Sequence, residues 1–262
     1  MAENTARPSI DIKDDLRQAA IVGKYEMIKF FSGKKIFIFG GLIILVAALV
    51  TILFIAFPGD NTTSKDVASS FVSFVTLLLL IGATLFSSVA LVSEFEERTA
   101  FTLFTKPVRK YSIFLGKFAA AYILNLGTIL VFYILGAIVT ACLTGGFVVE
   151  MFASFGYASL YAFALTGIAI FFSALMKKSS SASIMTFIFI LLVPSIVAMI
   201  ILLAMGSGTD IMDFWFILDV AANSLIDCFN KAVAGVRDAL VMIAWGLVPA
   251  IASYVLFRRK EV

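Results

Sequence analysis

Six long stretches of this sequence contain no charged residue, and they constrain the fold more than any other feature. All 20 Lys and Arg residues and all 17 Asp and Glu residues lie outside them. This partition is expected for a chain in lipid, where a charge at mid-bilayer costs about 2.5 to 3.5 kcal/mol or more. The charge-free stretches are 36–57, 67–92, 118–149, 151–176, 179–209 and 239–257.

Each stretch is long enough to form a membrane-spanning helix. A hydrocarbon core about 30 Å thick needs about 20 apolar residues of helix, and the backbone in lipid must satisfy its own hydrogen bonds. The composition agrees, because 61% of the residues are hydrophobic and only 14% are charged, against roughly 45 to 50% and about 25% in soluble domains. A water-soluble enzyme is therefore not expected. We predict an all-α membrane protein with six transmembrane helices at about 36–57, 69–92, 118–143, 153–176, 184–205 and 239–257, which make up a transmembrane domain over 36–257.

The distribution of basic residues predicts the orientation of the chain. Seventeen of the 20 Lys and Arg residues fall in four segments on one side of the membrane, and only Lys65, Lys231 and Arg237 fall on the other. Cytoplasmic loops hold the basic excess in membrane proteins. We therefore expect a multi-pass protein of the cell membrane with both termini in the cytoplasm, ending in a basic tail at 258–262. The net charge of +3 averages over two faces and does not point to nucleic acid as a partner; membrane lipids surround the chain instead.

Two segments outside the spans have helical patterns. Residues 1–35 form a cytoplasmic segment that includes a predicted amphipathic, interfacial helix, and a partly disordered tail is the alternative, chiefly for residues 1–9. The longest stretch on the opposite side, 206–238, predicts short interfacial helices, with a loop as the alternative. The apolar face of the N-terminal helix would contain Leu16, Ala19, Ala20, Met27, Phe30 and Phe31, opposite Asp14, Asp15, Gln18, Glu26 and Lys29.

The loop between the second and third spans, 93–110, predicts a short cytoplasmic helix. Ser93 and Glu96 fit a capping box at its start, and Pro107 ends it near Lys106. Its apolar side chains need either a partner surface or the lipid headgroups to cover them. The residues alone leave both alternatives open.

The residues of this loop resemble those of a known family. Glu94, Glu96, Glu97, Thr99, Leu103, Phe104, Thr105, Pro107 and Val108, followed by Leu115, Gly116 and Lys117, are similar to the second-to-third helix loop of type-2 ABC transporter permeases. The resemblance is strongest to the nitrous-oxide-reductase-associated and sodium-exporter-like branch. Arg98 stands where many members have Gly. The six spans and the cytoplasmic termini are also similar to that family.

The resemblance implies the permease subunit of an ABC transporter, with an exporter as the expected direction. In the family this loop is the coupling helix, which docks into a cytosolic ATP-binding subunit. The implied coupling residues are Glu94, Phe95, Glu96, Glu97, Arg98, Thr99, Phe101, Leu103, Phe104 and Pro107. The implied partners are two copies of that subunit and a second permease subunit, most simply as a homodimer.

No catalytic, cofactor or metal site is expected in this chain. It has no Gly-x-x-x-x-Gly-Lys-Ser/Thr motif for a triphosphate, so ATP and Mg belong to the partner subunit. It has no histidine, and its two cysteines, Cys142 and Cys228, are too few for a Cys-rich zinc site. The sequence leaves open whether they form a disulfide. We therefore expect a membrane transport subunit that is not itself an enzyme.

Small polar residues suggest a translocation path without establishing one. The candidates are Ser73, Thr76, Thr84 and Ser87 on the second span and Asn125 and Thr128 on the third. Residues of this kind also let membrane helices pack closely, so packing is the alternative.

Two other functions compete with the permease interpretation. A gradient-driven secondary transporter usually carries ionisable residues within its spans, and none is expected here. A non-transporting membrane scaffold is the third possibility. The apolar interior favours lipids, hydrophobic peptides or amphiphilic drugs as substrates, but it does not identify one.

Overall fold

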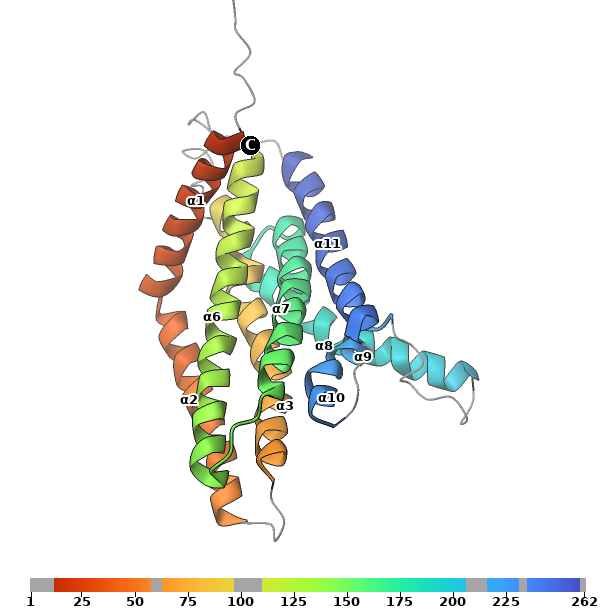
Figure 1. Cartoon of the computed structure of the whole chain (residues 1–262). Helices are drawn as coiled ribbons and strands as arrows, with labels where there is room; N and C mark the ends of the chain where they lie inside the picture. The colour runs from red at the N-terminus through yellow and green to blue at the C-terminus, as the bar shows by residue number, and fades with distance from the viewer. Residues whose placement is uncertain (1–11, 58–62, 97–109, 206–215, 231–234, 260–262) are drawn as a thin grey trace, which may run out of the picture.

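The computed structural model describes residues 12–57, 63–96, 110–205, 216–230 and 235–259, and the regular structure in these ranges is helical (Figure 1). Six helices are long and apolar enough to cross a membrane, which confirms the predicted all-α class with six spans. The spans are α2 (Lys34–Ala56), α3 (Ser64–Leu85), α6 (Lys110–Thr144), α7 (Glu150–Leu175), α8 (Ser179–Met205) and α11 (Gly235–Arg259). The other elements are α1 (Ile12–Ser32), η1 (Ser87–Val89), α4 (Val92–Glu96), α9 (Leu218–Ala222) and α10 (Ser224–Asn230).

Helix α7 is at the centre of the bundle. It packs against α3, α6, α8, α10 and α11, and most of its length is buried, as is most of α3. Helix α8 is mostly exposed and presents large apolar side chains such as Met199 and Leu203 on its outside. Exposed apolar side chains of this kind are suited to lipid or to another membrane helix.

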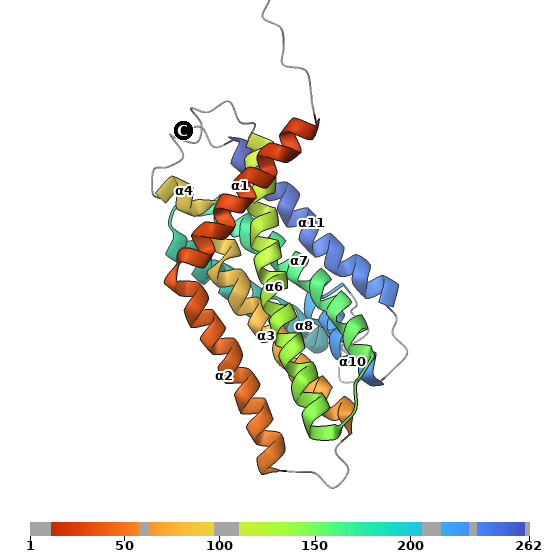
Figure 2. The same ribbon diagram turned by 60° about the vertical axis from the view of Figure 1, so that its left-hand side comes forward.

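Helix α1 packs along the first half of α6 and crosses it in the view of Figure 2. The predicted helix is present. Leu16 and Phe31, assigned to the apolar face, are more than half exposed, as a face turned to lipid would be, but Glu26, assigned to the polar face, is buried. The reason is that charge pairing and close backbone packing, rather than hydropathy, select the inner face of α1. Its location at the membrane interface remains a prediction.

Several spanning helices are longer than the apolar stretches that predicted them. Helix α6 begins at Lys110 rather than near residue 118, and α8 begins at Ser179 rather than near 184. Lys117 therefore lies inside a helix, and its assignment to a cytoplasmic loop was wrong. The helix can contain this charge because neighbouring helices supply partners for it.

The segment from 206 to 238 contains the short helices α9 and α10. They pack against α7, and they also contact α11 and α3, respectively. Residues 206–215 lie outside the described residues. An interfacial position for these helices remains a prediction.

Candidate functional site

The chain breaks its helical path where the second span ends. Helix α3 ends at Leu85, a single 3-10 turn follows, and α4 starts at Val92. Such a break leaves backbone N–H and C=O groups without helical partners inside an apolar bundle, where each unsatisfied group is costly. Other helices must therefore satisfy these groups.

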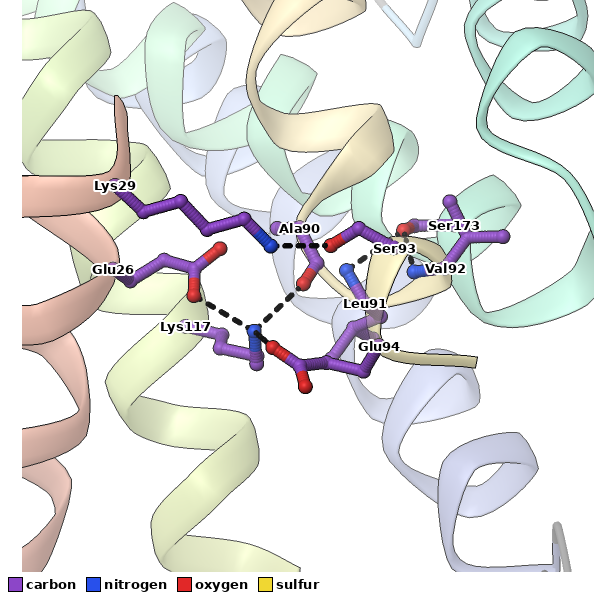
Figure 3. Close-up of polar contacts among 9 residues, drawn as sticks. All are labelled: Glu26, Lys29, Ala90, Leu91, Val92, Ser93, Glu94, Lys117 and Ser173. Atoms are coloured by element: carbon purple, nitrogen blue, oxygen red, sulfur yellow. Dashed lines mark hydrogen bonds and ion pairs between the residues drawn. The ribbon is translucent and has the colours of Figure 1, made fainter. Parts of the chain in front are cut away.

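A serine and a lysine supply the missing hydrogen bonds (Figure 3). Ser173 Oγ on α7 accepts from the backbone N–H groups of Leu91 and Val92, each at 3.0 Å. The Ala90 carbonyl accepts from Lys117 Nζ on α6, also at 3.0 Å. Side chains from two spans therefore hold the break in place.

Lys117 is the centre of a buried ion cluster. Its ammonium lies 2.8 Å from Glu26 Oε2 on α1 and 2.8 Å from Glu94 Oε1 on α4. With the bond to Ala90, all three of its donors are used. Lys117 is 2% exposed, so one side chain fastens α1, α4 and α6 together out of contact with water.

The cluster of Lys117, Glu26 and Glu94 carries two carboxylates and one ammonium. Glu26 Oε1 is buried and has no hydrogen-bond partner within the described part of the chain. Lys29 on α1 adds a second link by donating to Ser93 Oγ on α4 at 3.2 Å. Buried ion pairs add little net stability when complete, but removing one partner typically costs about 3 to 5 kcal/mol. The cluster therefore enforces one arrangement of these helices.

Two glycines allow Glu26 to reach Lys117. A Cβ atom added at Gly116 would lie 2.5 Å from the Ala19 carbonyl oxygen, and one added at Gly23 would lie 3.1 Å from the Gly116 carbonyl oxygen. Both distances are too short for ordinary packing, so the backbones of α1 and α6 touch here. Small residues serve this purpose between membrane helices.

Glu96, the last residue of α4, is bound to the start of α8. Its carboxylate accepts hydrogen bonds from the Ser179 hydroxyl and from the Ser179 backbone N–H, the latter at 2.8 Å. These bonds, with smaller contributions from Lys178 and Lys35, hold the pKa of Glu96 below its usual value. The neighbouring Phe95 packs edge-on against Phe257 of α11, with ring centroids 6.1 Å apart. Segment 92–96 therefore touches α8 and α11 as well.

The predicted capping box is wrong. Ser93 is the second residue of α4 and accepts from Lys29, while Glu96 caps α8 rather than the helix in which it lies. The tertiary partners outcompete the local ones. Of the predicted coupling residues, the structure describes Glu94, Phe95 and Glu96. The others, Glu97, Arg98, Thr99, Phe101, Leu103, Phe104 and Pro107, lie outside the described residues.

The predicted path residues are divided between buried contacts and an open pocket. Asn125 Nδ2 donates to Ser87 Oγ at 3.0 Å and to Thr166 Oγ1 at 3.1 Å, which joins three parts of the bundle. Thr76 lines a pocket. Four of the candidates donate their hydroxyl to a backbone carbonyl of their own helix: Ser73, Thr76, Thr84 and Thr128.

Both cysteines are free, and Cys228 donates to the Ser224 carbonyl.

Six helices that are long and apolar enough to cross a membrane define a multi-pass membrane protein. The family model described as ABC-2 family transporter protein matches residues 63–262. The chain belongs to this family and is therefore a membrane transport subunit of the permease type. No curated protein matches the chain significantly. The branch suggested by the loop remains a prediction.

Sequence reasoning missed the connection of Lys117 to Glu26 and the role of Ser173. The match begins at residue 63, so Glu26 lies before the matched region while Lys117, Glu94 and Ser173 lie within it. One signal was present in the sequence: Lys117 follows Gly116 and is the only charge between Tyr111 and Val149. An isolated lysine within an apolar run requires a partner.

Proposed function

We propose that the chain is the permease subunit of an ATP-driven exporter, in which two permease subunits pair with two cytosolic ATP-binding subunits. Those subunits bind ATP and Mg, and they dock on the segment 93–110. Family membership supports the permease role. The observation that carries the coupling proposal is the buried Lys117 cluster, which anchors the start of this segment to α1 and α6.

The contacts of α4 give the proposal a mechanical route. Glu94 connects to Lys117 on α6 and through it to α1, Glu96 binds the first residue of α8, and Phe95 meets α11. Ser173 holds the preceding backbone to α7. A displacement of segment 93–110 by a closing ATPase dimer would therefore act on four spans together and tilt them.

The test pairs the permease with its ATP-binding subunit in proteoliposomes. Phe101 and Leu103 lie in the proposed docking segment, and the variant Phe101→Asp/Leu103→Asp places charges there. We expect membrane insertion to be normal and permease-stimulated ATP turnover to be abolished. Normal stimulated turnover in this variant would refute the coupling role.

A control variant separates loss of docking from general damage. Phe147, between α6 and α7, is 58% exposed and lies at the far end of α6 from Lys110. Phe147→Asp introduces the same kind of charge away from the docking segment, and we expect ATP turnover close to that of the unmodified protein. The ATP-binding subunit should co-purify with the unmodified protein and with Phe147→Asp, and it should be lost from Phe101→Asp/Leu103→Asp.

Transport measurements discriminate the gradient-driven alternative. Lys117 is an ionisable residue near the start of the long helix α6, but its three donors are occupied by fixed partners. An exporter of the proposed kind loses transport when ATP is depleted and keeps it when an ionophore collapses the ion gradients. The opposite result would favour a secondary transporter.

A further inference from the structure

A pocket of about 370 Å³ lies between α3, α7, α8, α9 and α10, apart from the Lys117 cluster. This volume falls within the usual range for ligand sites, roughly 300 to 1,000 Å³. The pocket reaches the middle of two spans, at Thr76 and Leu77 on α3 and at Leu191 and Ser195 on α8. Asp219 on α9 also lines it, and the lining residues that the structure describes include no Lys or Arg.

Two of the three hydroxyl groups in the described lining, those of Thr76 and Ser195, are already committed as donors. Thr76 Oγ1 donates to the Ser73 carbonyl at 3.2 Å, and Ser195 Oγ donates to the Leu191 carbonyl at 3.0 Å. A hydroxyl has one hydrogen to donate and two lone pairs that accept. Toward the pocket these groups therefore offer acceptors, as does the Asp219 carboxylate.

Asp219 has an uncompensated charge. Its side chain is exposed in the structure and makes no ion pair or hydrogen bond with residues in the described ranges. The protein around it still removes enough water to raise the pKa of Asp219 above its usual value. The two described basic residues on the predicted outer side are paired elsewhere, Lys65 with Glu150 at 2.6 Å and Arg237 with Asp238 at 3.3 Å. A carboxylate in a largely apolar pocket favours a ligand that carries a positive charge.

We infer that this pocket binds an organic cation with an apolar body, its charge held by Asp219 and its body by the walls from α3 and α8. The inference rests on the proposed transport function, for which such a cation would be the substrate class. Tyr161 adds an aromatic ring to the lining, and aromatic rings also attract organic cations. Asp219 carries the only formal charge among the described lining residues, so an anion would meet a like charge there.

Two ions of similar shape and opposite charge test the inference. Tetraphenylphosphonium and tetraphenylborate are titrated by equilibrium dialysis against the purified full-length protein in a neutral detergent, without ATP. We expect saturable binding of tetraphenylphosphonium and at least about tenfold weaker binding to Asp219→Asn, since an interaction with a charged group contributes about 1.5 to 3 kcal/mol. Tetraphenylborate should show no saturable binding that depends on residue 219.

The matched control is Asp227→Asn, which removes a carboxylate from α10, outside the pocket lining. It should bind tetraphenylphosphonium like the unmodified protein. A second variant, Leu191→Trp, fills the pocket without changing charge and should also weaken binding. Unchanged affinity in Asp219→Asn, or an equal loss in Asp227→Asn, would overturn the inference.

One further arm identifies the source of the cation. Phosphatidylethanolamine is titrated against bound tetraphenylphosphonium; displacement assigns the pocket to an amine-bearing lipid, and no displacement assigns it to a soluble cation. Both outcomes retain the cation chemistry. Because binding is measured without ATP, a negative result here leaves the coupling proposal standing, and failure of the Phe101/Leu103 test leaves the pocket standing.

Discussion

The Lys117 cluster and the Asp219 pocket both hold carboxylates beside apolar helices, but Glu26 is buried against a lysine whereas Asp219 is exposed. Glu26 and Glu94 share a fixed lysine from a neighbouring helix, at 2.8 Å each. Asp219 faces an open pocket in which no described lining residue is a cation. A permanent partner makes a region rigid, whereas a missing partner leaves a place for an exchangeable one. The difference separates a part suited to transmitting force from a part suited to binding.

The largest expected effect is at Lys117. Lys117→Met removes the buried ammonium that Glu26, Glu94 and the Ala90 carbonyl share, and we expect a loss of about 3 to 5 kcal/mol in the free energy of unfolding. Thermal or denaturant unfolding of the purified protein measures it. Lys65→Met, which breaks the exposed pair with Glu150, is the control and should cost about 0 to 1 kcal/mol. Similar losses in the two variants would remove the contrast between buried and exposed pairs.

The next effect is expected at Ser173. Ser173→Ala removes the acceptor for two buried backbone N–H groups, and an unsatisfied buried group costs about 1 to 3 kcal/mol. Ser195→Ala removes a hydroxyl bonded only within its own helix and should change stability by less than about 0.5 kcal/mol. The same unfolding assay compares them. ATP turnover stimulated by the permease should fall in Ser173→Ala and should not change in Ser195→Ala.

A smaller effect of opposite sign is expected at Asp219. Because burial raises its pKa in the folded protein, ionisation of Asp219 is disfavoured there, and stability falls as the pH rises above the usual pKa of an aspartate. Asp219→Asn should therefore stabilise the protein slightly at pH 7, by about 0.5 kcal/mol or less. The gain should shrink as the pH falls toward the usual pKa of an aspartate, because the folded carboxyl takes up its proton at a higher pH than the unfolded one. Destabilisation at pH 7 would indicate a partner for Asp219.

The smallest effect is expected at Glu96. Its pKa is lowered by the Ser179 bonds, so its stabilising contribution is present at pH 7 and is lost as the pH falls through that lowered pKa. A melting-temperature series from pH 7 to pH 3 measures the loss. Glu96→Gln should lower the neutral plateau slightly, because the charge-dependent contribution is gone, and should flatten this acid limb. An unaltered acid limb would contradict the bond to Ser179.

The spans were predictable from sequence, but the site was not. A charge-free run of about 20 residues permits few structures in lipid, so the six helices followed from local composition. The partners of Lys117 lie 91 and 23 residues away in sequence, on Glu26 and Glu94. Hydropathy placed Lys117 in a loop and Glu26 on a polar face, because it scores residues singly and cannot detect a pair. The contact between Gly23 and Gly116, which brings them together, leaves only a weak trace in composition.

The backbone contact between α1 and α6 sets how far a small movement can reach. Helix α6 extends from Lys110 to Thr144 as one uninterrupted rod. At 1.5 Å per residue, its far end lies about 40 Å beyond Lys117. If the rod pivots at the glycine contact, a rotation of about 5° displaces that end by about 3.5 Å, by the same geometry. A displacement of this size is comparable to the width of a methyl group, so sub-ångström changes on one side of the bilayer would be enough to open or close a passage on the other.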